Sequence, residues 1–222
     1  MKLVENEGGD ALTMRRLAAD LNVATTTIYW HVGGRDELVL AVIKRLSDLQ
    51  STTAITGDTP LERILCVATK IWSNALNHRN ITALAHQSGA TSLLGLPMEI
   101  AMAQELNAAG VHGAQARDAL RAILSCVAGF LVVGFRSTAI ESEAASQATR
   151  QIQPQVLWSE VTDTGIDAAT LAAMRVSPKL NPLFQTTMRA VIGAFLPSSA
   201  DAIATSSTPE AAPTTRRAND RA

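Results

Sequence analysis

The segment TTTIYWH, residues 25–31, gathers an unusual number of hydrogen-bonding side chains. Hydroxyls, a phenol, an indole N–H and an imidazole can each bond to a phosphate oxygen or to the edge of a base. A threonine methyl group also suits contact with the methyl group of thymine. Because β-branched threonine lowers helix propensity, a helix that only filled a core would gain little from three of them. The composition therefore favours a short helix whose outer side contacts double-stranded DNA. That side consists of Thr25, Thr26, Thr27, Tyr29, Trp30 and His31.

Other interpretations exist for some of these residues. Tyr29 and Trp30 could be core aromatics, although adjacent helical residues lie about 100° apart and cannot both point inward. His31 suits either a phosphate or the negative end of its own helix. The nearby pair Arg15 and Arg16 could be plain solvated residues, and for Arg16 we favour that interpretation.

The elements around this segment predict a helix-turn-helix. LTMRRLAADL, residues 12–21, should form a helix that Thr13 caps. Asn22 tolerates the left-handed conformation that a tight turn needs. A second helix follows over residues 25–32, Gly33-Gly34 ends it, and a third runs over residues 35–50. We expect four residues to point inward, namely Ala18, Leu21, Val23 and Ile28.

Residues 12 to about 46 resemble the DNA-binding head of the tetracycline-repressor (TetR) family. The family pattern runs through a helix, a Gly-Val turn, a short recognition helix that ends in Tyr-x-His, and a basic start of the next helix. IYWHV in this chain nearly matches the LYWHV of the tetracycline repressors. The resemblance implies that Arg15 reaches a base or phosphate and that Thr25 and Thr26 face the bases. It implies contacts to the DNA backbone from Thr27, Tyr29, Trp30, His31 and Arg35.

Three features depart from the family pattern. Asn22 stands in place of the usual turn glycine. Ala24 stands in place of the common N-cap serine, so we expect Thr25 to cap the second helix. Only MKLVE precedes the polar NEGG, whereas family heads begin with a first helix of roughly three turns. We therefore expect either a truncated or misassigned chain start or a weakly held head.

The rest of the chain is expected to be a helical body, so the predicted fold class is all-α. Further helices are predicted over residues 60–79, 81–91, 94–109, 113–141, 167–175 and 181–196, with a long loop over 142–165. The predicted domains are a DNA-binding head over 1–46, a ligand-binding and dimerisation body over 47–197, and a disordered tail over 198–222.

The body offers candidates for a small-molecule pocket. They are Trp72, His86, Met98, Met102 and Trp158. His86 lies roughly where tetracycline repressors have a magnesium ligand, but the other ligands have no counterparts, so we expect a pocket residue and no metal or cofactor. For the tryptophans and methionines, the alternative is that they are ordinary core residues.

The two most apolar helices, 113–136 and 181–196, have too much apolar circumference for surface helices. We expect them to form a four-helix homodimer interface, in which Ser125 and Gly129 permit close approach. A two-fold dimer would place two heads one DNA turn apart, about 34–36 Å, on an inverted repeat.

Composition limits the other possibilities. The net charge is −1, so any positive surface for DNA must be local. Cys66 and Cys126 lack metal-site spacing and suggest reduced, buried thiols of a cytoplasmic protein. There is no secretory signal, and the apolar run 122–135 is shorter than the roughly 20 residues that span a bilayer, so no membrane association is expected. No catalytic motif supports an enzyme.

We therefore expect a ligand-responsive transcriptional regulator, most simply a repressor of palindromic operators that a small-molecule inducer releases. The alternative is a dimeric small-molecule-binding or interaction protein without a functional DNA-binding head.

Overall fold

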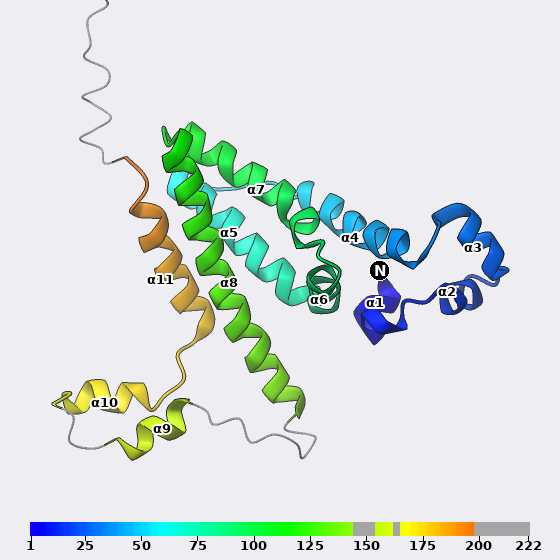
Figure 1. Ribbon diagram of the computed structural model, residues 1–222. Helices are drawn as coiled ribbons and strands as arrows, with labels where there is room; N and C mark the ends of the chain where they lie inside the picture. Colours follow the sequence, from blue (N-terminus) through cyan, green and yellow to red (C-terminus); the bar gives the residue numbers. More distant parts are fainter. Residues whose placement is uncertain (144–153, 162–164, 198–222) are drawn as a thin grey trace, which may run out of the picture.

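The computed structural model describes residues 1–143, 154–161 and 165–197 of the chain. These ranges contain helices and no strand, which confirms the all-α prediction. Figure 1 shows α1–α3 as a head at one end of α4, and a bundle of α5, α7, α8 and α11 at the other. The helices are α1 (Lys2–Glu7), α2 (Met14–Asp20), α3 (Thr25–Val32), α4 (Arg35–Ser51), α5 (Pro60–Asn77), α6 (Arg79–Gln87), α7 (Thr91–Ala108), α8 (Gly113–Glu143), α9 (Pro154–Glu160), α10 (Ala168–Met174) and α11 (Leu180–Gly193), with a 3₁₀ turn, η1, at Gly9–Ala11.

The turn between α2 and α3 forms as the sequence predicts. The Thr13 hydroxyl oxygen accepts a hydrogen bond from the N–H of Arg16 at 3.1 Å and caps α2. Asn22 has φ 54°, and the backbone N–H groups of Asn22 and Val23 donate to Ala19 and Ala18. These two bonds complete a Schellman motif, which ends α2 and sends the chain into α3.

The prediction that four residues of the helix-turn-helix point inward is only half correct. Ala18 and Ile28 are buried, whereas Leu21 is 58% exposed and Val23 is 42% exposed. The helices meet at Ala18 and Ile28, and the turn that carries Leu21 and Val23 extends beyond that contact. The expectation that these two side chains pack inward was therefore wrong.

The first helix is short and is held by contacts with a distant part of the chain. α1 continues to Glu7, past the point at which we expected a polar turn, and Gly8 ends it at φ 86°. Val4 is fully buried. His78 Nδ1 lies 2.7 Å from a carboxylate oxygen of Glu5, and the Asn80 amide donates to the Glu5 carbonyl at 2.8 Å. α1 has only six residues and buries little surface, and these contacts with the start of α6 help to hold it in place.

Two hydrophobic cores lie along the molecule. The first joins α1, α2, α3 and α4 to α6 and the start of α7, through residues such as Ile43, Ile81 and Leu94. The second fills the bundle of α5, α7, α8 and α11, with Met102 and Phe184 fully buried. Because the first core includes α6, packing extends across residue 46. The domain boundary at that position stays a prediction.

The predicted loop over residues 142–165 was wrong where the structure describes it, because Pro154–Glu160 forms α9. Proline suits the first turn of a helix, and this signal was overlooked. Residues 144–153 and 162–164 lie outside the described ranges, as does the tail predicted to be disordered, 198–222. In Figure 1, α9 and α10 lie together at one end of the molecule, below the bundle.

The apolar part of α8 is longer than the sequence estimate. Gly113–Phe135 spans 23 residues and contains an 18-residue window with a mean hydropathy of 1.8, so by length and composition it could cross a bilayer. The 14-residue run 122–135 counts only uninterrupted apolar residues, whereas the longer segment also includes Arg117, Asp118 and Arg121. Core helices of helical bundles have the same property, and here Ile123 and Val127 pack into the second core. Only 22% of the window is buried within this single chain.

Candidate nucleic-acid interface

α3 is anchored by one side and leaves the others open to solvent. Ile28 is buried and Val32 is half-buried against the first core. Tyr29 is 53% exposed and Trp30 is 86% exposed. The face predicted for DNA contacts is therefore on the surface, and it includes Thr25, half-buried, and exposed Thr26, Thr27 and His31.

The start of α3 differs from expectation. Ala24 is the N-cap residue, and no side chain caps the helix there. Thr25 is the first helical residue, so the prediction that it caps α3 was wrong. Its hydroxyl is consequently not committed to a cap.

The end of α3 depends on both glycines. Gly33 has φ 90° and donates its N–H to the Tyr29 carbonyl at 2.9 Å. The N–H of Gly34 donates to the Glu37 carboxylate at 2.8 Å, which starts α4. A Cβ on Gly34 would lie 2.9 Å from a Glu37 carboxylate oxygen, too close for a carbon atom. The chain therefore leaves α3 at Val32 and turns at once into α4.

The three arginines near α3 differ in their availability. Arg16 forms ion pairs with Glu7 at 2.9 Å and Asp20 at 3.0 Å, and hydrogen bonding and charge from Asp20, then Glu7, raise its pKa. Arg35 donates weakly to the Gly9 carbonyl at 3.4 Å. Arg15 is exposed and has no polar partner among the described residues. Of the adjacent pair, Arg15 is the one free to reach a phosphate.

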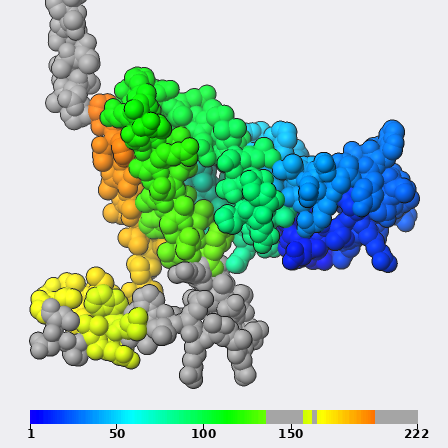
Figure 2. All heavy atoms as spheres, in the orientation of Figure 1, coloured from blue at the N-terminus to red at the C-terminus, as the bar shows by residue number. Residues whose placement is uncertain are grey.

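The candidate DNA contacts thus converge on one tip of the molecule. Arg15 comes from α2, the polar face from α3, and Arg35 from the first residue of α4. Figures 1 and 2 show α3 at the end of the head that lies farthest from the bundle. Residues 1–46 hold six basic and six acidic residues, so the head has no excess of positive charge, and a cation for DNA must come from single side chains such as Arg15.

The predicted pocket residues do not form one site. Trp72, Met98 and Met102 are buried in the second core, as the core interpretation had it. His86 is exposed on α6. Trp158 lies on α9, where its carbonyl accepts from the Arg175 guanidinium at 3.4 Å. In the described ranges no cluster of three His, Cys, Asp or Glu side chains could hold a metal ion.

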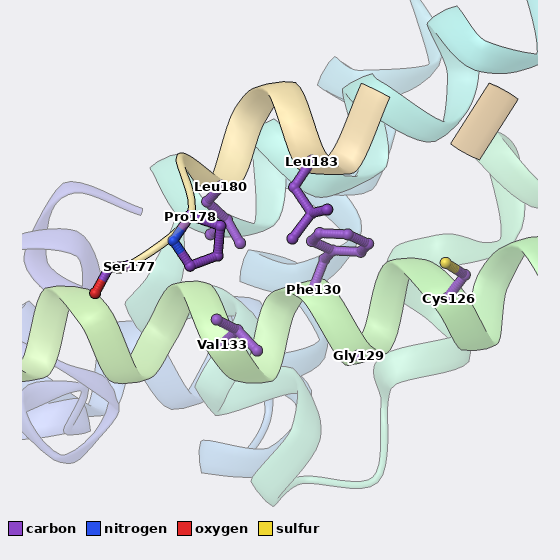
Figure 3. A pocket seen from close by; sticks show the side chains of 8 residues that line it. All are labelled: Cys126, Gly129, Phe130, Val133, Ser177, Pro178, Leu180 and Leu183. Carbon is purple, nitrogen blue, oxygen red and sulfur yellow. The ribbon is translucent and has the colours of Figure 1, made fainter. Parts of the chain in front are cut away.

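A cavity that the sequence did not indicate lies between α8 and the chain entering α11 (Figure 3). Its volume is about 540 Å³, and its lining residues are Cys126, Gly129, Phe130, Val133, Ser177, Pro178, Leu180 and Leu183. The sequence could not indicate this cavity, because apolar residues at helical spacing follow the same pattern whether they line a cavity or fill a core. Cys66 and Cys126 are free thiols, and they are partly buried where we expected buried side chains. Cys126 borders the cavity, and Cys66 lies 3.7 Å from the Thr56 hydroxyl.

Comparison with known proteins agrees with this geometry. Residues 1–42 match the family described as bacterial regulatory proteins, tetR family. No curated protein matches the chain. Among solved structures, the transcriptional regulator SCO7222, a TetR from Streptomyces coelicolor, is 20% identical over 87% of this chain and 92% of its own, with a TM-score of 0.66.

A second relative from S. coelicolor has been solved in two states. Apo ActR, a TetR family protein, is 19% identical over 90% of this chain and 92% of its own, with a TM-score of 0.63. ActR in complex with actinorhodin is 20% identical over 87% of this chain and 91% of its own, with a TM-score of 0.59. The head of the chain, residues 1–42, therefore matches the tetR family of bacterial regulatory proteins, and the described chain shares the fold of these solved TetR-family structures.

Proposed function

We propose that the chain is a cytoplasmic transcriptional repressor that binds a palindromic operator as a homodimer and leaves it when a small molecule binds. The observation that carries this proposal is the exposed polar face of α3 at the tip of the head. A helix with this much uncommitted polar and aromatic surface suits the major groove, with Thr25 and Thr26 toward the bases. Arg15, Thr27, Tyr29, Trp30, His31 and Arg35 then contact the backbone of the DNA.

The homodimer is supported by the outer sides of α8 and α11. On α8, exposed Ser125, Ala128 and Val132 follow one another at helical spacing. A Cβ on Gly129 would meet nothing within 4 Å, so the chain's own fold does not explain this glycine. At the end of α11, the small residues Ala190, Gly193 and Ala194 are exposed as well. Two such helix pairs would bury apolar surface and approach closely.

Release by a small molecule is supported by the cavity and by the family. ActR has been solved with actinorhodin, and SCO7222 shares the fold of this chain. A ligand that binds one spacing of the two heads better than the other shifts the population toward it. Repression follows if the ligand-free spacing is the one that fits the operator.

A second candidate, a dimeric small-molecule-binding protein without a working head, is favoured by two observations. α1 has only six residues, and the head carries as many acidic as basic residues. Titration of the full chain with DNA from the region flanking its coding sequence separates the two functions. The repressor requires binding at low salt; the absence of binding there would favour the second candidate.

The adjacent arginines provide a matched pair for that titration. Arg15→Ala removes a free cation, whereas Arg16→Ala removes one already paired with Glu7 and Asp20. Each phosphate contact contributes about 0.9 to the slope of log K against log salt, so two lost Arg15 contacts per dimer should reduce it by about 2. Arg16→Ala should leave the slope unchanged. Equal slopes for the two variants would refute an α2 contact with phosphate.

A further inference from the structure

The cavity between α8 and α11 has the lining of a site for an uncharged molecule. Its volume of about 540 Å³ lies within the range of small-molecule sites. None of its lining residues is acidic or basic, and Ser177 and Cys126 supply its polar side chains. Burial raises the pKa of the Cys126 thiol, so that group stays neutral at physiological pH. A charged ligand would lose its hydration here without gaining a counter-ion.

Three aromatic rings connect this cavity with the interior of the bundle. Phe130 lines the cavity, and its ring meets Phe184 edge-on at 5.1 Å. Phe184 stacks on Trp72 at 4.4 Å with the planes 12° apart. Figure 3 shows Phe130 on α8 pointing toward α11, beside Leu183. A rotation of Phe130 would extend the cavity toward the other two rings.

Trp72 holds a polar group that the fold leaves without a partner. Its side chain is 7% exposed, and its indole Nε1 is buried with no acceptor among the described residues. Such a donor is rare in a folded protein because its water bonds are lost and nothing replaces them. Phenylalanine could stack on Phe184 equally well, so packing alone does not account for the N–H.

The end of α5 also lies close to the cavity wall. One turn after Trp72, Leu76 approaches Gly134 so closely that a Cβ there would lie 3.0 Å from a Leu76 methyl carbon. The same Cβ would lie 3.6 Å from Leu180, a cavity residue. α5 and α8 are therefore in tight contact beside Leu180 of the cavity wall, one helical turn from Trp72 along α5.

We propose that the cavity between α8 and α11 binds an uncharged, largely apolar ligand with a hydrogen-bond acceptor, which takes the N–H of Trp72 as Phe130 rotates. Within the proposed function, this ligand is the effector. Val133 and Leu183 at the rim are about half exposed, on the side that the proposed dimer would cover. Dimerisation would then shield the bound molecule from water.

The test compares two probes of similar shape, 2-acetylnaphthalene and 2-isopropylnaphthalene, by calorimetry with the full chain and no DNA. The ketone should bind about 10-fold more tightly, as expected for one hydrogen bond to a buried donor. Trp72→Phe keeps the ring stack and removes the donor, so the ratio of affinities should fall to about 1. Trp158→Phe, on α9, is the matched control and should keep the ratio. Naphthalene-2-carboxylate should not bind.

Failure of binding of the ketone, or an unchanged ratio in Trp72→Phe, would overturn the proposal. If Trp72→Phe does not fold, Leu183→Trp decides instead: it fills the cavity from the rim, and it should abolish binding of both neutral probes. Unchanged binding in this variant would place the probes elsewhere and refute the site. The calorimetry contains no DNA, so it tests the site independently of the repressor proposal. If the ketone binds but a separate titration shows no change in operator affinity, the result counts against the repressor mechanism and not against this site.

Discussion

Asn22 shows how one residue sets the geometry of the head. Among the described residues it is the only non-glycine with a positive φ, 54°. The backbone N–H groups of Asn22 and Val23 close the turn on Ala19 and Ala18. A change at this position therefore alters the crossing of α2 and α3, and with it the position of the DNA-facing helix.

Replacement of Asn22 should separate backbone strain from side-chain chemistry. Asn22→Val places a β-branched residue in the left-handed region and should lower the free energy of unfolding by about 1–2 kcal/mol. Asn22→Gly should leave it within about 0.5 kcal/mol, since glycine accepts this conformation without strain. Urea unfolding of the two variants measures the difference. Similar midpoints for both would mean that the turn does not need this backbone conformation.

At the scale of helices, the outer sides of α8 and α11 should determine assembly. Ala128→Arg puts a charge in the middle of the proposed interface, where a partner would bury it without a counter-ion. We expect the dissociation constant of the dimer to rise at least about 100-fold, with loss of operator binding. Gln115→Arg adds the same charge near the start of α8 and should remain dimeric. Analytical ultracentrifugation distinguishes them; a dimeric Ala128→Arg would exclude this surface as the interface.

The sequence was most informative where local chemistry decides the structure. The Thr13 cap, the Asn22 turn and the glycine stop at Gly33 each act within a few residues, and all three were recognised. The exposure of Leu21 could not be predicted, because it depends on where two helices cross. The cavity beside Phe130 was missed for the same reason: its lining comes from two segments about 50 residues apart, and both are apolar as a core would be.

The predicted site residues also divide by scale. The polar residues of one short helix could be grouped from spacing alone, and the structure leaves all of them on α3 at least partly exposed. Trp72, His86 and Trp158 were grouped by residue type, and the structure places them on α5, α6 and α9. Side-chain type suggests what a residue can bind, but only packing decides which residues share a site.

For the molecule as a whole, α4 connects the head to α7, a helix that contributes to both cores. α4 supplies Val39 and Ile43 to the first core, and the buried Ser47 hydroxyl donates to the Leu93 carbonyl on α7 at 3.0 Å. A shift of α7 relative to α4 would therefore tilt the head. With two copies joined through their bodies, a small tilt of each head would change the distance between the two α3 helices.

The inclusion of α6 in the first core limits how such heads can be exchanged between regulators. Ile81, Leu84 and Leu94 pack with Val4 and Ile43, and Asn80 bonds to α1. A chimera cut after α4 would give the transplanted segment a foreign surface in place of these partners. Grafts that aim to transfer operator preference to another body should therefore carry residues 1–94, or replace the α3 face alone and keep the recipient's own interior.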